Sequence, residues 1–290
     1  MASLFRQRTQ DLLWAGPGRV VTVWGPTGSP GRSTLAAALA GTLAPTARVV
    51  LVDADRSRGA LGPLLGIMGG GNIASAATFP PPHDQPCRPR DLHEHRAGFT
   101  LIRGVPGPAQ EVALTPADLT ALLARLRLSF DLVLVDVGDA LPPREFGDVH
   151  LAALHAADLI LVVGALTHLG LSDLTLQTRA LAERLDAVGR DADLPTWCVL
   201  NKGHGRLLRS GGERIAAETG LSVVMSLPLD TRNVVAAEEA RLPLTVARPR
   251  SPAAALIAGL AVRGRRALAE MSNAGVAGGQ NDVGQEMTRR

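Results

Sequence analysis

Cysteine is nearly absent from this chain. Its 290 residues include only two cysteines, Cys87 and Cys198, which lie far apart in the sequence. Two distant cysteines cannot build a disulfide framework, and without a CxxC motif an iron–sulfur cluster is not supported. Cysteine usage of this kind is typical of the reducing cytoplasm, so we expect a cytoplasmic protein.

Long apolar stretches are missing as well. No run approaches the roughly 18 residues that a membrane-spanning helix needs. The first residues, Met1-Ala-Ser-Leu-Phe-Arg-Gln-Arg8, lack the apolar core of a secretory signal. Hydrophobic residues still make up 46% of the chain, enough to bury a large core in one domain of ordinary size.

Lysine is almost missing, because Lys202 is the only one and arginine carries the remaining positive charge. The net charge is +3 and the isoelectric point is about 9.6. This mild excess permits weak, non-specific contact with DNA or with a membrane surface but does not require it. No aromatic platform accompanies the arginines, so sequence-specific reading of DNA is not expected.

The most informative stretch that is present runs from Val20 to Thr34 and reads Val-Val-Thr-Val-Trp-Gly-Pro-Thr-Gly-Ser-Pro-Gly-Arg-Ser-Thr. It has the pattern of a buried strand, a tight glycine loop and the start of a helix, which together bind phosphate through backbone N–H groups and the helix dipole. The usual motif is GxxxxGK[ST]. Here Pro26 replaces the first glycine and Arg32 replaces the lysine.

Two further apolar runs end in carboxylates. Residues 48–55 end in Asp53 and Asp55, and residues 131–136 end in Asp136. Because ligands of an open parallel sheet bind at the carboxyl ends of its strands, we expect these aspartates beside the glycine loop. A phosphate loop with such carboxylates is an arrangement that coordinates Mg²⁺ and orients water, although a single aspartate at a strand end is also a common turn residue.

Strand and helix patterns alternate along the chain, which predicts an α/β fold with a mostly parallel sheet of about seven strands and helices on both faces. Strands are expected near 20–24, 48–53, 99–103, 131–136, 158–163, 196–200 and 222–227. Helices are expected near 32–44, 116–128, 145–156, 171–188, 207–219, 231–240 and 252–270. The predicted organisation is an extension over 1–17, one domain over 18–270 with a surface loop at 69–97, and a disordered tail over 271–290.

Seven short motifs occur in an order that resembles the MinD/ParA superfamily of deviant Walker A ATPases over residues 18–268. Within that superfamily the chain is most similar to CpaE/TadZ-like and actinobacterial septum-site or partitioning proteins. The resemblance implies a P-loop NTPase three-layer sandwich. The motifs are Gly28-Ser-Pro-Gly-Arg-Ser-Thr34, Val52-Asp-Ala-Asp55, Val135-Asp-Val-Gly-Asp139, Ala157-Asp-Leu-Ile-Leu-Val-Val163, Leu200-Asn-Lys202, Leu227-Pro-Leu-Asp230 and Ala247-Arg-Pro-Arg-Ser-Pro252.

The resemblance implies ATP and Mg²⁺ as ligands and assigns a role to individual residues. The catalytic pair would be Asp55, which positions the attacking water, and Arg32. Mg²⁺ would be held by Ser33, Asp53 and Asp136. The nucleotide would be bound by Gly28, Ser29, Pro30, Gly31, Arg32, Ser33 and Thr34 at its phosphates, and by Asn201, Pro228 and Asp230 beside the adenine.

Two departures from the family pattern leave two functions open. The extra lysine that reaches across the family's dimer is Thr27 here, and Arg32 presents a planar guanidinium where a compact ammonium is expected. One hypothesis is a switch that forms a homodimer on ATP, hydrolyses it slowly and positions pilus or secretion, septum or chromosome machinery through a protein partner at the membrane, pole or septum. The other is a pseudo-ATPase that acts as a localisation scaffold.

The final predicted helix also has two interpretations. Apolar side chains fall on one stripe of residues 252–268, with Arg263, Arg265 and Arg266 nearby. A basic helix with an apolar stripe can lie on a membrane surface. The stripe is mostly alanine, so we favour a helix packed on the sheet.

Overall fold

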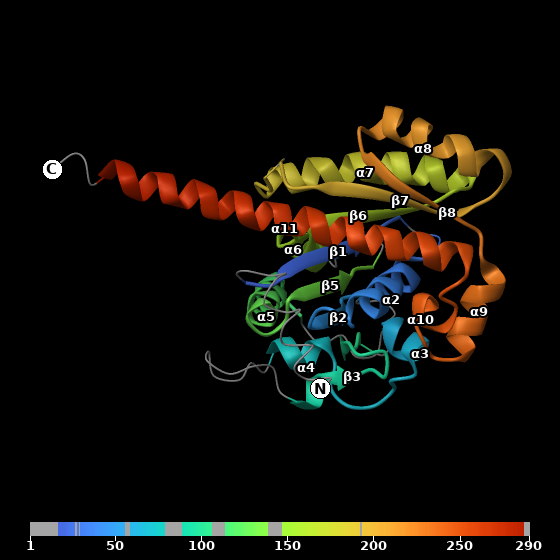
Figure 1. The fold of residues 1–290 in the computed structure, drawn as a ribbon, viewed down its shortest axis with the longest axis horizontal. Helices are drawn as coiled ribbons and strands as arrows, with labels where there is room; N and C mark the ends of the chain where they lie inside the picture. The colour runs from blue at the N-terminus through green and yellow to red at the C-terminus, as the bar shows by residue number, and fades with distance from the viewer. Residues whose placement is uncertain are drawn as a thin grey trace.

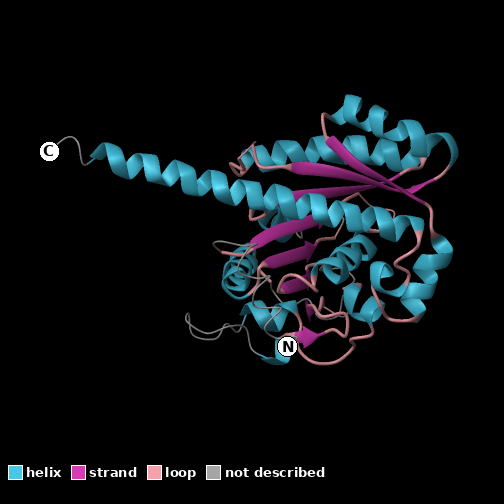
Figure 2. Cartoon of the chain, viewed as in Figure 1, coloured by secondary structure: helices cyan, strands magenta, loops and turns pink. Residues whose placement is uncertain are grey.

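The computed structural model describes residues 17–26, 28, 30–55, 59–78, 89–105, 114–138, 147–191 and 193–286, without the side chains of 148 and 272–286. Eight strands form one sheet in the order β3-β4-β2-β5-β1-β6-β7-β8 (Figures 1 and 2). All neighbours pair in parallel except β3 and β4. The strands are β1 (Arg19–Trp24), β2 (Val49–Asp53), β3 (His93–Glu94), β4 (Thr100–Ile102), β5 (Leu132–Asp136), β6 (Leu159–Ala165), β7 (Thr196–Gly203) and β8 (Ser222–Pro228).

Helices cover both faces of the sheet and make three layers, as predicted. Alternate residues of each strand enter different cores, because side chains of a strand point to opposite faces. Val20 and Trp24 of β1 enter one core, whereas Val21 and Val23 enter the other. The first core is covered by α4 (Ile73–Thr78), α5 (Pro116–Ser129), α6 (Gly147–His155), α7 (His168–Ala187) and α8 (Gly205–Thr219). The second is covered by α2 (Arg32–Leu43), α3 (Leu61–Leu65), α9 (Thr231–Glu239), α10 (Leu244–Ala247) and α11 (Pro252–Glu286).

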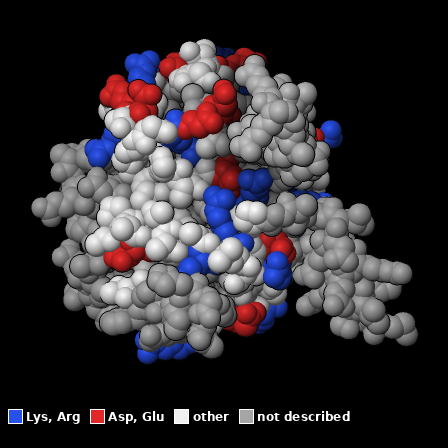
Figure 3. Space-filling view, turned by 90° about the vertical axis from the view of Figure 1, so that its left-hand side faces the viewer, with Lys and Arg blue, Asp and Glu red and all other residues white. Residues whose placement is uncertain are grey.

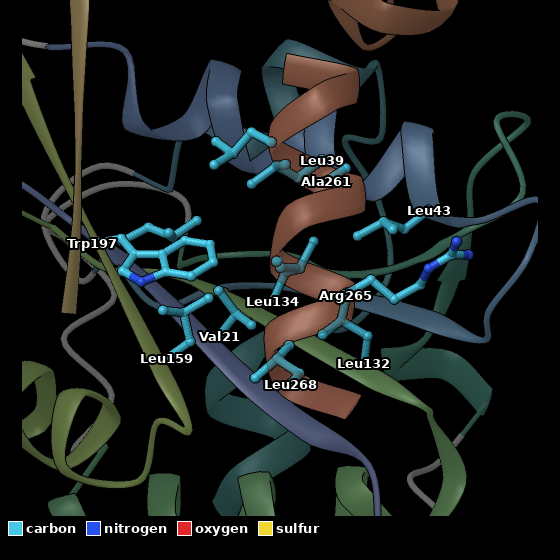
Figure 4. Close-up of a pocket in the computed structure, with 13 residues that line it drawn as sticks. Val21, Leu39, Leu43, Leu132, Leu134, Leu159, Trp197, Ala261, Arg265 and Leu268 are labelled. Carbon is cyan, nitrogen blue, oxygen red and sulfur yellow. The ribbon is translucent and has the colours of Figure 1, made fainter. Parts of the chain in front are cut away.

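Helix α11 is packed on the sheet and is longer than predicted. Ile257, Leu260, Ala261 and Leu268 are buried in the second core. A small apolar cavity of about 30 Å³ remains between this helix, α2 and the strands (Figure 4). Beyond this contact the helix continues past the body of the molecule to Glu286 (Figure 1), where the sequence predicts a disordered tail from 271 onwards.

The predicted surface loop over 69–97 is in part regular and buried. Its residues Ile73, Ala74, Ala76 and Ala77 enter the first core from α4. Asn72 begins this helix, because its side-chain oxygen accepts the N–H of Ala74 at 3.0 Å. The short strand β3 follows, pairs with the edge of β4 and raises the strand count from seven to eight. Residues 79–88 of this segment lie outside the described residues.

Ion pairs connect β1, α5 and the start of β6 at the end of the sheet where the strands begin. The carboxylate of Asp158 contacts Arg19 at 3.0 Å and Arg127 at 2.9 Å, and it accepts the N–H of Val20 at 2.7 Å. Figure 3 views this end, where basic and acidic side chains adjoin on the surface. Within the described residues, no helix is long and apolar enough to span a bilayer.

Candidate functional site: a nucleotide-binding loop and its cavity

The loop between β1 and α2 depends on two glycines. Gly28 and Gly31 have φ values of 87° and 98°, in the left-handed region that favours glycine. Gly31 is the N-cap of α2, and no side chain caps that helix there. Its first turn also contains no acidic residue, so the positive end of the helix dipole is open to an anion. Thr27 and Ser29 lie outside the described residues.

Arg32 lies folded back along the loop. Its Nη1 atom donates hydrogen bonds to the carbonyl oxygens of Gly25 at 2.5 Å and Pro26 at 2.7 Å. The guanidinium is still close enough to Asp136 to oppose the rise in the pKa of that carboxyl. The positive charge expected of a phosphate loop is therefore inside the site, but part of its hydrogen-bonding capacity is taken by the loop itself.

Asp53 and Asp136 end neighbouring strands and are register partners of β2 and β5. Burial raises the pKa of Asp136 to about 7, while a hydrogen bond from Ser33 and the charge of Arg32 act against the rise. The Oδ1 atom of Asp136 is buried and has no hydrogen-bond partner among the described residues. An orphaned carboxylate oxygen beside a serine hydroxyl fits a divalent cation with oxygen ligands.

Asp53 is already engaged by the backbone. Its Oδ2 atom accepts the N–H of Leu61 at 2.9 Å, and its Oδ1 atom accepts the N–H of Asp55 at 3.3 Å. Burial, followed by the charge of Asp136, raises its pKa well above the ordinary value. These contacts hold the chain that carries Asp55, so a direct role of Asp53 toward a metal stays a prediction. The described residues contain no cluster of three or more His, Cys, Asp or Glu suited to a metal.

Asp55 lies against Gly138, just past the end of β5. A Cβ atom built on Gly138 would stand 2.9 Å from Oδ1 of Asp55 and 3.1 Å from Cε1 of His150. Sequence reasoning missed His150, a buried residue of α6. Its only signal is a histidine inside a predicted helix that follows Asp136, and that pattern alone does not reveal this contact. Asp139 lies outside the described residues.

A cavity of about 330 Å³ opens beside the start of α2 and brings together the three residues predicted to lie beside the adenine and Thr34, which is predicted to bind the phosphates. Thr34, Asn201, Pro228 and Asp230 all line it. The sequence did not indicate the apolar residues contributed by the three following helices. These are Val234 and Val235 of α9, Leu244 of α10, and Ala253 and Ile257 of α11.

Asn201 joins this cavity to the phosphate loop. Its Nδ2 atom donates to the carbonyl of Pro30 at 2.8 Å, and its Oδ1 atom accepts the N–H of Lys202 at 2.8 Å. Gly31 is required beneath it, because a Cβ there would stand 2.4 Å from Nδ2. Across the cavity, Oδ1 of Asp230 accepts from Asn233 at 2.6 Å, while its buried Oδ2 has no hydrogen-bond partner among the described residues.

Solved structures share this architecture. A ParA family ATPase from Chlorobium tepidum superposes with a TM-score of 0.70 and 19% identity over 84% of this chain and 98% of its own. The chain has the fold of the MinD/ParA ATPases.

Two MinD structures agree with that assignment of the MinD/ParA fold. The septum site-determining protein MinD from Pyrococcus horikoshii, complexed with Mg-ADP, has a TM-score of 0.68 at 17% identity over 84% of this chain and 94% of its own. MinD from the Aquifex aeolicus MinC:MinD complex has a TM-score of 0.67 at 18% identity over 85% and 95%. No model of a protein family and no curated protein matches the chain.

Proposed function

We propose that this protein is an ATP-binding, Mg²⁺-dependent switch of the MinD/ParA/CpaE type that hydrolyses ATP slowly. The observation that carries the proposal is the 330 Å³ cavity, which Thr34 and Gly31 connect to the uncapped start of α2. A cavity of this size suits a nucleobase and its sugar, and the helix start suits the phosphates. The P. horikoshii MinD of the same fold is complexed with Mg-ADP.

Adenine is inferred from the residues near the base position. Asp230 lines the cavity, and its carboxylate is an acceptor for the exocyclic amino group of a purine. The amide of Asn201 carries both a donor and an acceptor beside the loop. A guanine-specific site would present an aspartate three residues after Asn201, and that position is His204.

Ser33 and Asp136 would hold Mg²⁺, with Asp53 supporting the site from the neighbouring strand. A bound Mg²⁺ would supply charge that offsets the phosphates during transfer. The serine hydroxyl donates to the Asp136 carboxyl and acts against the rise in its pKa, so the two groups lie close enough to share a ligand. Asp55, placed by the N–H contact to Asp53, would hold the attacking water.

Slow turnover follows from the state of Arg32. The guanidinium must give up its hydrogen bonds to Gly25 and Pro26 before all of its donors can serve the phosphates. Phosphoryl transfer depends mostly on placed positive charge, so this competition raises the barrier. The alternative is a hydrolysis-deficient scaffold, which Arg32 and Thr27 favour and the retained Asp55 and Asp136 oppose.

The cellular role is proposed at the level that the fold supports. A nucleotide-dependent homodimer would act in the cytoplasm, in some states at the membrane, pole or septum, and position pilus or secretion, division or partitioning machinery through a protein partner. The MinD of A. aeolicus, which has this fold, is found in a complex with MinC. Weak contact with DNA or a membrane surface is consistent with a net charge of +3.

A titration with Mg·ATP, with GTP as competitor, tests nucleotide binding. We expect saturable binding that prefers ATP, is lost in Asp136→Ala and is unchanged in Asp186→Ala, an exposed carboxylate of α7. No binding at millimolar Mg·ATP would overturn the proposal.

A phosphate-release assay then separates the two functions. If the protein is an ATPase, Asp55→Ala should abolish slow turnover while ATP binding remains. Binding without any release of phosphate would instead support the scaffold, and turnover unchanged by Asp55→Ala would remove Asp55 from the mechanism.

A further inference from the structure

The two edge strands of the sheet differ in how much backbone they leave open to pairing. At one edge, β3 contains only two residues and runs antiparallel to its neighbour, so little backbone is left open there. At the other edge, β8 contains seven residues and pairs only with β7 among the described strands. Short edge strands limit association through a sheet edge, whereas a long apolar one invites it. The sheet is therefore open to pairing at its β8 edge.

A groove of about 420 Å³ follows this edge between β8 and α8. Its floor is made by residues 221–226, which include Val223, Val224 and Met225. Its wall is made by four residues of α8, namely Arg209, Gly212, Glu213 and Ala216. These four positions are spaced at three, four and seven residues and form one helical stripe.

The wall of the groove contains two small residues. Gly212 brings α8 close to the strand, because a Cβ there would lie 3.4 Å from Cγ1 of Val223. Ala216 adds a second small side chain on the same stripe, one turn further along. The register between β7 and β8 shifts beside Val224, and a bulge of this kind twists an edge strand and makes its open side a poorer template for backbone pairing. The side chains of the groove are therefore the better contact surface.

Two opposite charges on the stripe favour a second copy of this chain as the occupant. Arg209 and Glu213 are exposed, and neither has an ion-pair partner in the part of the chain that the structure describes. When two such helices cross in antiparallel fashion about a two-fold axis, Arg209 of each faces Glu213 of the other. A two-fold interface requires this self-complementarity.

We propose that two copies dock through the stripe of α8 and the groove beside β8, in a symmetric dimer that needs no nucleotide. The contact would place α8 of each copy beside the apolar floor of the other, with two Arg209–Glu213 pairs at its rim. This interface is separate from any nucleotide-dependent dimer, because none of its groove residues lines the base cavity.

Charge reversal tests the proposal on the full chain without nucleotide, by sedimentation velocity over a range of concentrations. We expect a concentration-dependent dimer in the wild type. Arg209→Glu and Glu213→Arg should each weaken it about tenfold or more, because each places like charges opposite one another. The double variant should restore dimerisation, which loss of folding cannot mimic.

Matched reversals outside the groove provide the control. Arg250→Glu, just before α11, and Glu183→Arg on α7 change exposed charges by the same amounts and should leave the dimer intact. Ala216→Trp, a substitution at an exposed position, should block the contact without changing charge. A wild type that stays monomeric at about 100 µM, or a double variant as weak as the single ones, would overturn the proposal. The assay contains no ATP, so failure of nucleotide binding leaves its outcome unaffected.

Discussion

At the scale of single residues, the site combines positions that cost stability with positions that serve binding. Asp136 is the clearest case, because burial without a partner for Oδ1 raises its pKa to about 7. A buried carboxyl of this kind lowers the stability of the fold, and the proposed Mg²⁺ would offset that cost by pairing with its charge. The ionisation of Asp136 therefore affects both the pH dependence of stability and the proposed binding of Mg²⁺.

Asp136→Asn should stabilise the nucleotide-free protein in a pH-dependent way. The folded pKa of about 7 lies above the ordinary 3.8, so the stability contributed by the protonated carboxyl is lost as pH rises from about 4 through 7. The asparagine variant does not ionise and escapes this loss. Thermal melts should show its Tm a few degrees above wild type at pH 8, with the difference fading toward pH 4. A difference that is constant with pH would contradict the assignment.

Alanine substitutions at Gly31 and Gly28 distinguish a steric clash from backbone strain. Both have positive φ, so alanine strains the backbone by about 1–2 kcal/mol at either position. Only at Gly31 would the new Cβ meet another group, Nδ2 of Asn201 at 2.4 Å. We expect Gly31→Ala to weaken ATP binding at least tenfold more than Gly28→Ala in a titration. Equal losses would show that Asn201 does not hold the loop.

At the scale of elements, the sequence predicts what depends on local pattern. The apolar runs 131–136 and 158–163 correspond to β5 and β6, and the Thr115-Pro116 start begins α5 with a capping box. The sequence did not predict the short helix α4. Its six residues are too few to show the periodicity of a helix, and its burial depends on residues that are distant in the sequence.

The sequence predicts which residues belong to the candidate site but not the contacts that their side chains make with one another. Strand ends and motif order located the aspartates, Asn201 and Pro228. The contacts of Arg32 with loop carbonyls, and the position of His150 beside Gly138, depend on backbone paths that no spacing reveals. Side-chain direction at such places is set by tertiary packing.

Gly264 lies within α11 and offers a stabilising substitution. A Cβ there would meet only Cζ3 of Trp197 at 3.9 Å, and it would border the small apolar cavity. Alanine at this position should add about 1 kcal/mol to the free energy of unfolding, because glycine inside a helix is unfavourable.

Gly41 of α2 is the matched control for Gly264. A Cβ on Gly41 would stand 2.9 Å from Cγ2 of Val246, so Gly41→Ala should destabilise the protein instead. Urea unfolding of both variants distinguishes the two effects. A loss of stability in Gly264→Ala would mean that α11 packs more closely than described.

At the scale of the whole molecule, stability and binding occupy opposite ends of the sheet. The Asp158 ion pairs fasten the ends at which the strands begin, while the loop and the carboxylates lie at the ends where they finish. This separation predicts that the two properties can be changed independently.

Asp158→Ala should test that separation. It leaves Arg19 and Arg127 without their carboxylate and the N–H of Val20 without its acceptor, which should cost about 2–4 kcal/mol of unfolding free energy. ATP affinity measured well below the Tm should stay within about twofold of the wild type. A large loss of affinity in the folded variant would show that the two ends of the sheet are coupled.

Helix α11 spans the distance between those ends as one rod. Its first turns, through Ala253 and Ile257, form part of the cavity wall, and its 35 residues reach roughly 50 Å at the rise of an α-helix. Leu260, Ala261 and Leu268 hold the middle of this helix in the second core, so a single continuous element runs from the wall of the base cavity to the part of the chain furthest from it.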